Sequence, residues 1–313
     1  MKTGFIFPGQ GAQYPGMGQD LYEKSPAVRE LFAAAQEAVD FPVKETLFNG
    51  SEEDLKRTDI TQVAITLVNL SAAALLRENG IQPDAVAGFS LGEYAALVTA
   101  GVIQPEDVFP LVKSRGEIMA EESAGLIDAG GAPGMAAVIG LPPDKVVEAL
   151  AGRTDVFAAN LNSPMQTVVS GTAAGLETAK DLLKAAGARR IIVLKVSGPF
   201  HSPLLQPARE RIAEYIADIH FQNPKLPLFS NVTAAQIETG DEAKRLCLEH
   251  ITSPVRWVEE EQHMLDFGIT RFLEVGPGTV LAGLVQGLLK QEPREGIEVL
   301  PAGTVEDIAA LLT

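Results

Sequence analysis

The residues best suited to chemistry lie in Gly88-Phe-Ser90-Leu-Gly92, which fits the pattern G-x-S-x-G. An apolar stretch at 84–89 precedes the serine and a helical pattern at 91–99 follows it, which is the strand–turn–helix context of a nucleophile elbow. Glycines permit a tight turn, so Ser90 Oγ would stand clear of the sheet beside N–H groups at the helix start, including that of Leu91. The motif alone is equally compatible with a serine that only caps a helix between two turn glycines.

A serine nucleophile needs a base, and histidine is the usual one near neutral pH. Of the four histidines, His220 and His263 lie in polar stretches typical of a surface. His250 ends a helical segment, where a partly exposed helix-end histidine is the plain explanation. His201 follows a strand, through the turn 197–200, and strand ends carry the ligand-contacting residues of open α/β sheets. His201 is therefore the candidate base.

Two further segments carry polar chemistry. The turn Gly9-Gln10-Gly11 follows an apolar strand, but a dinucleotide-binding loop would need a third glycine at the position of Tyr14. A turn beside a strand end suits a second donor to an oxyanion better, since it presents backbone N–H groups. Arg115 lies in a helical pattern, and composition alone favours a surface arginine in a salt bridge.

Composition limits the classes of function. The 313 residues include 41 Asp and Glu against 25 Lys and Arg, a net charge of −16 that disfavours nucleic acid and anionic membranes as partners. The single Cys247 rules out an intrachain disulfide and a Cys-based zinc site, and we expect no metal. The apolar run Phe5–Phe7 is too short for a signal peptide, and we expect no later run long enough to span a membrane. A soluble, cytoplasmic protein is the resulting expectation.

The chain exceeds the length of a usual single core, which favours a large domain with a smaller one. Strand and helix patterns alternate over 1–133 and 198–313, which predicts an α/β domain with a mostly parallel sheet. These patterns include a helix around 21–39 and a strand near Leu228. Residues 134–197 have strand-like stretches at 135–141, 156–161, 166–171 and 189–197, with helical stretches at 142–150 and 175–187. This βαββαβ order predicts an inserted ferredoxin-like subdomain.

The ordered motifs together resemble the malonyl-coenzyme A:acyl-carrier-protein transacylase family of type II fatty-acid synthesis. The resemblance runs from Phe5 to about Leu289, and the family's fold, an α/β-hydrolase-like domain with a ferredoxin-like insert, agrees with the predicted elements. The matching blocks are FPGQGAQYPGMG (7–18), TQVA (61–64), GFSLGEYAAL (88–97), KSRGEIM (113–119), GMAAVIGL (134–141), NSPMQTVVSG (162–171), VSGPFHSPLL (197–205), SPVRW (253–257) and EVGPGTVL (274–281).

The resemblance implies a role for each candidate residue. Ser90 would be the nucleophile and His201 its base, while Arg115 would pair with the free carboxylate of a malonyl group. The oxyanion-hole N–H groups would come from Gln10 and Leu91, and Gln62 and His250 would be substrate-binding residues of the pocket. The implied activity is transfer of malonyl from malonyl-CoA to the phosphopantetheine thiol of acyl carrier protein, by a ping-pong route through malonyl-serine. No permanently bound cofactor is implied.

Three positions bear on how closely the family pattern is kept. A backbone carbonyl orients the base in this family, from a position that is usually Gln and corresponds here to His250. Phe89 stands where the family commonly has His before the serine, and His201 already fills the role of base. Phe200 resembles the pattern of malonyl-selective rather than methylmalonyl-selective acyltransferases.

Alternative functions stay open at this point. A free-standing malonyltransferase of polyketide synthesis would use the same chemistry on another carrier. A serine thioesterase or esterase would need an acidic partner for His201, and a non-catalytic scaffold would usually show damage at the serine, the histidine or the glycines. An acidic carrier needs a basic patch, for which we expect Lys180, Lys184, Arg189, Arg190 and Lys195 of the subdomain; the other interpretation is a solvated helix face.

Overall fold

The main sheet of the computed structural model is parallel and has the strand order β2-β1-β7-β8. The structure describes residues 1–127, 130–196 and 198–312. The strands are β1 (Lys2–Phe7), β2 (Ala85–Gly88), β7 (Ile269–Glu274) and β8 (Glu298–Pro301). β1 and β2 are buried along nearly their whole length, as a parallel sheet covered on both faces requires.

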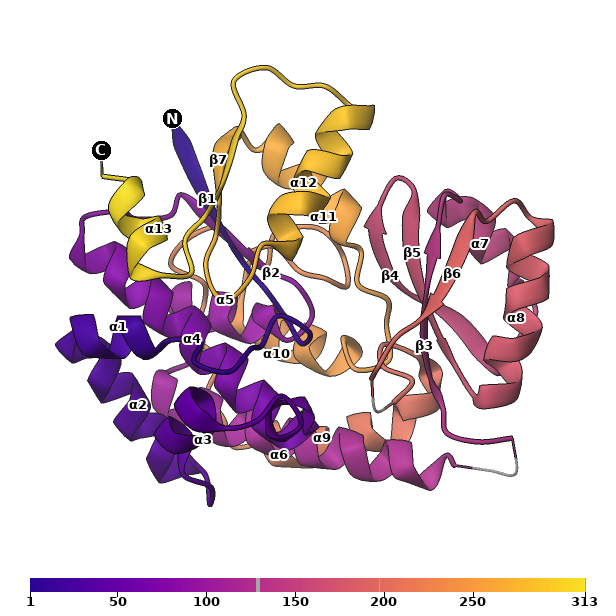
Figure 1. Ribbon diagram of the computed structural model, residues 1–313, viewed down its shortest axis with the longest axis horizontal. Coiled ribbons are helices and arrows are strands. Elements are labelled where there is room, and N and C mark those ends of the chain that lie inside the picture. The colour runs from indigo at the N-terminus through magenta and orange to yellow at the C-terminus, as the bar shows by residue number, and fades with distance from the viewer. Residues whose placement is uncertain (128–129, 197, 313) are drawn as a thin grey trace.

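Alternate residues of β1 belong to two different cores. Phe5 and Phe7 pack among the helices on one side of the sheet, whereas Ile6 packs with the helices on the other. The first side has α4 (Thr58–Glu78), α5 (Gly92–Thr99) and α6 (Pro105–Gly125), and the second has α11 (Trp257–Asp266) and α12 (Val280–Gln291) (Figure 1). Both faces of the sheet are thus covered. This packing fixes the position at which the chain leaves β2 after Gly88.

Helix α4 corrects one expectation from the sequence. Its 21 residues are long and apolar enough to cross a membrane, so the expectation that no later run reaches that length is wrong. The protein itself buries 89% of the most apolar window of this helix. A helix that is apolar on all sides is typical of the buried core of a large domain. Around it lie α1 (Gln19–Lys24), α2 (Pro26–Ala38) and the 3-10 turn Asp54–Lys56, and α3 (Val43–Asn49) packs against α2 and that turn.

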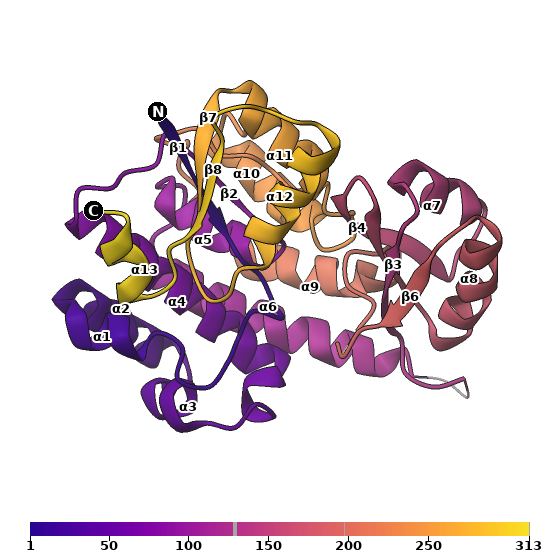
Figure 2. The same ribbon diagram turned by 45° about the horizontal axis from the view of Figure 1, so that its top comes forward.

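A second, antiparallel sheet forms a separate body beside the first (Figure 2). Its element order is β3 (Gly134–Ile139), α7 (Pro143–Ala149), β4 (Val156–Ser163), β5 (Gln166–Gly171), α8 (Ala173–Ala185) and β6 (Arg190–Val193). The strand order β4-β5-β3-β6 and this βαββαβ sequence confirm the predicted ferredoxin-like unit. The strand predicted to 197 ends at Val193, and residue 197, the last of the predicted subdomain 134–197, lies outside the described residues.

The small sheet joins the main body through β4. Leu161 N–H donates to Val255 O, and Val255 N–H donates to Ala159 O, each at 2.8 Å. This main-chain link places one face of the small sheet opposite the edge at which β1 and β2 end. The remaining elements are the 3-10 turn Pro203–Leu205, α9 (Gln206–Ile216), α10 (Gly240–Glu249) and α13 (Val305–Ala310).

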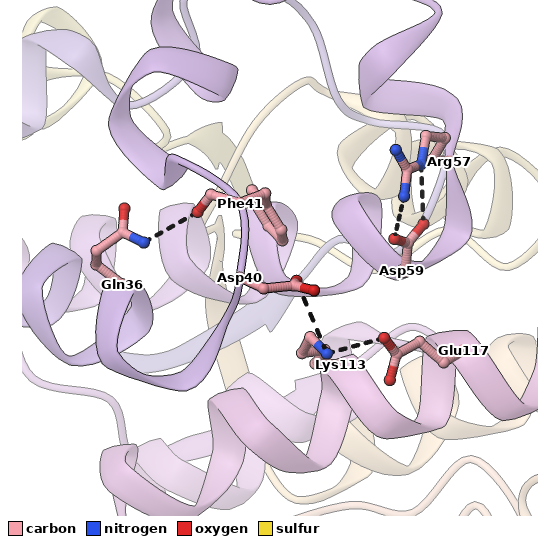
Figure 3. A network of polar contacts seen from close by, with 7 residues as sticks. All are labelled: Gln36, Asp40, Phe41, Arg57, Asp59, Lys113 and Glu117. Carbon is pink, nitrogen blue, oxygen red and sulfur yellow. Dashed lines mark hydrogen bonds and ion pairs between the residues drawn. The ribbon is translucent and has the colours of Figure 1, made fainter.

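Polar contacts on the outside of α6 tie it to the loop after α2. Lys113 Nζ lies 2.8 Å from Glu117 Oε1 and 3.9 Å from Asp40 Oδ1. Figure 3 shows these ion pairs together with the neighbouring pairs Gln36–Phe41 and Arg57–Asp59. Because residues two apart on a helix face different sides, Arg115 points away from this network and into the protein.

Candidate active site

The segment between β2 and α5 forms a sharp turn with Ser90 at its tip. Ser90 has φ 52°, a left-handed conformation that is uncommon for a residue with a side chain. The turn is closely packed: a Cβ on Gly92 would overlap the Phe7 carbonyl, and one on Gly9 would overlap the Phe89 carbonyl. The predicted need for small residues around the serine therefore has a direct cause, the close approach of the β1 end to the elbow.

Ser90 and His201 lie in contact. Ser90 Oγ is 2.7 Å from His201 Nε2, and His201 Nδ1 is 3.0 Å from the His250 carbonyl oxygen. A carbonyl oxygen can only accept, so Nδ1 carries the hydrogen and Nε2 is left to accept from the serine hydroxyl. The pair is therefore arranged with the tautomer that a general base needs.

The environment of His201 favours its neutral form. Burial lowers its pKa to about 4, and the positive charge of Arg115 acts in the same direction, against the effect of the hydrogen bond to the His250 carbonyl. Its side chain is only 3% exposed. An imidazole with a low pKa is free to accept a proton throughout the neutral range.

His250 differs from its predicted surroundings. It is 1% exposed, so the explanation as a partly exposed helix-end histidine is wrong. Its ring lies against that of His201, with centroids 4.8 Å apart and planes inclined by 32°. Burial, followed by the nearby His201 and Arg115, holds the pKa of His250 well below its usual value. Its side chain is not among the cavity-lining groups, and it supports His201 from behind.

Arg115 is a buried cation at the same place. It is 2% exposed, which makes the surface interpretation wrong. Arg115 Nη1 donates to Gln62 Oε1 at 2.7 Å, and Cζ lies 5.3 Å from the centre of the Tyr94 ring. Within residues 1–127, 130–196 and 198–312, no carboxylate forms an ion pair with Arg115, and its Nε has no acceptor. A buried guanidinium without an anion is suited to bind one.

These groups meet in a cavity of about 290 Å³ between the two sheets. Ser90, His201, Arg115 and Gln62 line it, and so do Gln10 and Leu91. Neither Gln10 N–H nor Leu91 N–H has an acceptor among the described residues. Two free main-chain donors therefore border the cavity that holds the Ser90–His201 pair. Phe89 and Phe200 are also lining residues, together with apolar groups from α6, α12 and β3.

The sequence interpretation missed several polar residues of this site. Asn160, Asn162 and Gln166 reach the cavity from β4 and β5, and Asn162 Oδ1 is buried without a partner among the described residues. The alternation of Asn160 and Asn162 on one face of a strand was the available signal.

Asn231, also missed, holds the elbow, since its Oδ1 accepts from Ser90 N–H at 2.7 Å. Only its place near the end of a predicted strand pointed to it.

The predicted docking residues lie outside the cavity. Lys184, Arg189, Arg190 and Lys195 are exposed near the end of α8 and beside or in β6, the edge strand of the small sheet. Lys180, also predicted, is half-buried and forms an ion pair with Glu177. The same edge exposes two apolar side chains, Ile192 by 46% and Val193 by 61%. The next residues along the chain, Leu194 and Val196, line the cavity. A basic and partly apolar strip thus runs to the cavity from the small sheet.

Comparison with known proteins finds relatives over nearly the whole chain. A family described as "Acyl transferase domain" matches residues 4–307. A malonyl CoA-acyl carrier protein transacylase of Bacillus subtilis is 40% identical over 289 residues, which are 91% of this chain and 90% of the relative. The crystal structure of an acyl carrier protein S-malonyltransferase from Vibrio cholerae superposes with a TM-score of 0.92 at 34% identity, covering 99% of this chain and 100% of the other.

A structure of a type II polyketide acyl carrier protein in complex with its malonyl-transacylase gives a TM-score of 0.91 at 32% identity. The match covers 100% of this chain and 99% of that chain. Together with the first two comparisons it confirms the predicted α/β fold class, because the two-sheet architecture is shared from end to end.

Proposed function

The chain belongs to the acyltransferase family of the malonyl CoA-acyl carrier protein transacylases, and on that premise we propose that it transfers malonyl from malonyl-CoA to an acyl carrier protein through Ser90. The observation that carries the proposal is the buried Arg115, which has no anionic partner among the described residues and lines the same cavity as Ser90 and His201. The cavity thus joins a nucleophile to a binding site for the free carboxylate of an acyl group.

In the first half-reaction Ser90 Oγ attacks the thioester carbon while His201 Nε2 takes the hydroxyl proton. The carbonyl electron pair moves onto oxygen, where Gln10 N–H and Leu91 N–H stabilise the charge; loss of one such donor typically costs roughly 3 kcal/mol. The C–S bond then breaks, and the imidazolium returns its proton to the leaving coenzyme A thiolate. Malonyl-serine remains.

In the second half-reaction the phosphopantetheine thiol of the carrier enters the same cavity and gives up its proton to His201. Its sulfur attacks the malonyl-serine carbonyl, and Ser90 leaves with the proton that His201 holds. The polar groups of Asn160, Asn162 and Gln166 suit the amide groups of the phosphopantetheine arm. Ping-pong kinetics follow from the shared site.

The partner of the base supports transfer over hydrolysis. The thioesterase alternative required an acidic partner for His201, whereas Nδ1 faces the carbonyl of His250. A neutral partner stabilises the imidazolium less than a carboxylate does, which departs from the pattern of a serine hydrolase. Selectivity for malonyl is assigned to Arg115, whose fork matches a carboxylate and which acetyl groups would leave unpaired.

We assign docking of the acidic carrier to the strip formed by Lys184, Arg189, Arg190 and Lys195, because its charge is opposite to that of the carrier and it leads to the cavity. The carrier of fatty-acid synthesis is proposed as the cognate partner, with cytoplasmic location. A carrier of polyketide synthesis is the second candidate, favoured by the similarity to the polyketide malonyl-transacylase in complex with its carrier.

The test is mass spectrometry of the intact protein after brief exposure to malonyl-CoA, with Ser90→Ala alongside. We expect a malonyl adduct on Ser90 that holo-carrier protein removes and that persists in buffer. An adduct that water discharges as fast as the carrier does would identify a thioesterase. Absence of any adduct on the wild-type protein would contradict the proposed acyl donor or the nucleophile. Comparing fatty-acid and polyketide carriers as acceptors identifies the partner.

A further inference from the structure

The carboxamide of Asn231 ties together three parts of the chain beneath the serine. Ser90 N–H donates to Asn231 Oδ1 at 2.7 Å, and Asn231 Nδ2 donates to Gly88 O at 2.7 Å and to Glu260 Oε2 at 2.9 Å. Asn231 N–H in turn donates to Glu93 Oε2 at 3.0 Å. Asn231 is fully buried, so bulk water does not compete for these bonds.

This geometry admits only one orientation of the amide. The oxygen faces a donor, Ser90 N–H, and the nitrogen faces two acceptors, Gly88 O and Glu260 Oε2. A carboxylate of the same shape would keep the first bond but lose both donors. Its second oxygen would then stand against the Gly88 carbonyl oxygen and repel it.

The acids around Asn231 are mostly neutral below about pH 8. Burial raises the pKa of Glu93 to about 8, and burial, together with the neighbouring Glu93, raises the pKa of Glu260 well above its usual value. Glu93 from α5 and Glu260 from α11 are the titratable side chains that bond to Asn231 among the described residues. The guanidinium of Arg256, at the start of α11, pairs instead with Glu259. A new negative charge beneath the elbow would therefore stand beside these acids, while Arg115, whose charge lowers the pKa of Glu93, lies on the cavity side.

We propose that Asn231 is a positioning residue for the nucleophile, whose carboxamide clamps Ser90 and Gly88 so that the elbow keeps its left-handed conformation. The inference rests on the proposed function. A left-handed serine costs free energy, and the conformation persists only where surrounding bonds enforce it. Because Asn231 occupies the N–H of Ser90, the next N–H along the turn, that of Leu91, is the one left to the cavity that Leu91 lines.

The test compares the rate of Ser90 malonylation in Asn231→Asp, Asn231→Ala and the wild type at pH 6 and pH 8. Asn223→Asp is the matched control, since its side-chain oxygen also accepts a main-chain N–H, that of Gly240, but outside the elbow. We expect both Asn231 variants to acylate on the order of 100-fold more slowly at pH 8, with KM for malonyl-CoA changed less than about threefold.

The pH readout separates positioning from a general loss of structure. At pH 6 the buried carboxyl group introduced by Asn231→Asp takes up a proton and regains one O–H donor for Gly88 O, while its other oxygen accepts from Ser90 N–H. We expect that variant to recover by roughly tenfold relative to wild type, whereas Asn231→Ala does not recover and Asn223→Asp matches wild type at both pH values. Glu260→Gln, which keeps a neutral acceptor for Asn231, retains most of the activity.

The outcomes are distinct. Slow acylation with acid recovery in Asn231→Asp alone supports the clamp. Acylation of Asn231→Asp at the wild-type rate at pH 8 overturns it, and so does a loss that is equal at both pH values and parallels a fall in the urea unfolding midpoint. A wild-type protein that forms no adduct defeats the proposed function first, and this inference with it.

Discussion

The surroundings of the single residue Arg115 predict how its substitution changes selectivity for the acyl donor. Its guanidinium contacts the Gln62 amide and the Tyr94 ring, so a substrate carboxylate would be its first anionic partner. We expect Arg115→Ala to lower kcat/KM for malonyl-CoA by roughly 10³-fold and to change acetyl transfer by less than about tenfold. Arg115→Lys keeps the charge but lacks the two-pronged guanidinium, so its kcat/KM for malonyl-CoA should lie between those of the wild type and Arg115→Ala. Steady-state kinetics with both donors decide; an equal loss for malonyl and acetyl would contradict the assignment.

The low pKa of His201 predicts an unusual pH profile. The base works only when neutral, so activity should hold as pH falls through 6.5 and decline near 4, where the buried imidazole gains its proton. The measurement is the single-turnover rate of Ser90 malonylation between pH 4 and 8. His250→Gln is the control, because the main-chain carbonyl that orients His201 remains. A decline centred on the ordinary value of histidine would show that His201 is more hydrated than its burial implies.

Ser90 and His201 could be predicted from the sequence because a local motif marks the serine and a strand end marks the histidine. The burial of Arg115 and His250 could not, since their neighbours come from distant segments. Asn231 shows the reason most clearly: its partner Ser90 lies 141 residues away, and no local pattern encodes that contact. The role of a residue can be predicted from sequence where it depends on a local motif. It cannot where it depends on packing between segments that are distant in the chain.

At the scale of elements, the elbow depends on the close approach of β1 to the start of α5. We expect Gly92→Ala to lower the free energy of unfolding by about 3 kcal/mol or more, because the new methyl overlaps the Phe7 carbonyl. Gly287→Ala, in the middle of α12 with open space around it, should instead stabilise by about 0.5–1 kcal/mol. Urea unfolding of the two variants gives the comparison; similar effects would show that the elbow relaxes around the methyl.

Most helices and strands could be predicted from the sequence, and the predictions that were wrong have physical reasons. The helix expected over 21–39 is divided into α1 and α2, since Pro26 starts a new helix that Ser25 caps. The strand expected near Leu228 is reduced to an isolated bridge with Val86. β8 and α13 were not predicted; β8 is a short, partly exposed strand at the sheet edge, and such strands lack a clear apolar pattern.

At the scale of the whole molecule, a chain of net charge −16 has to receive an acidic carrier. Charge reversal at Arg189 and Arg190 should raise KM for the carrier by roughly tenfold and weaken its salt dependence, while malonylation of Ser90 by malonyl-CoA stays near the wild-type rate. Reversal at Lys24 and Lys56, exposed on other helices, is the matched control. An unchanged KM for the carrier would place docking on another face.

The order of strands in the main sheet also bears on how the protein is made. β1 is synthesised well before β7, yet Lys2 pairs with Ile269, so this part of the sheet stays open until β7 has been made. During that time α4, apolar enough to resemble a membrane segment, lacks much of its final cover. We expect the nascent chain to depend on chaperones at this stage, so the yield in cells should follow chaperone supply more closely than the stability of the finished fold.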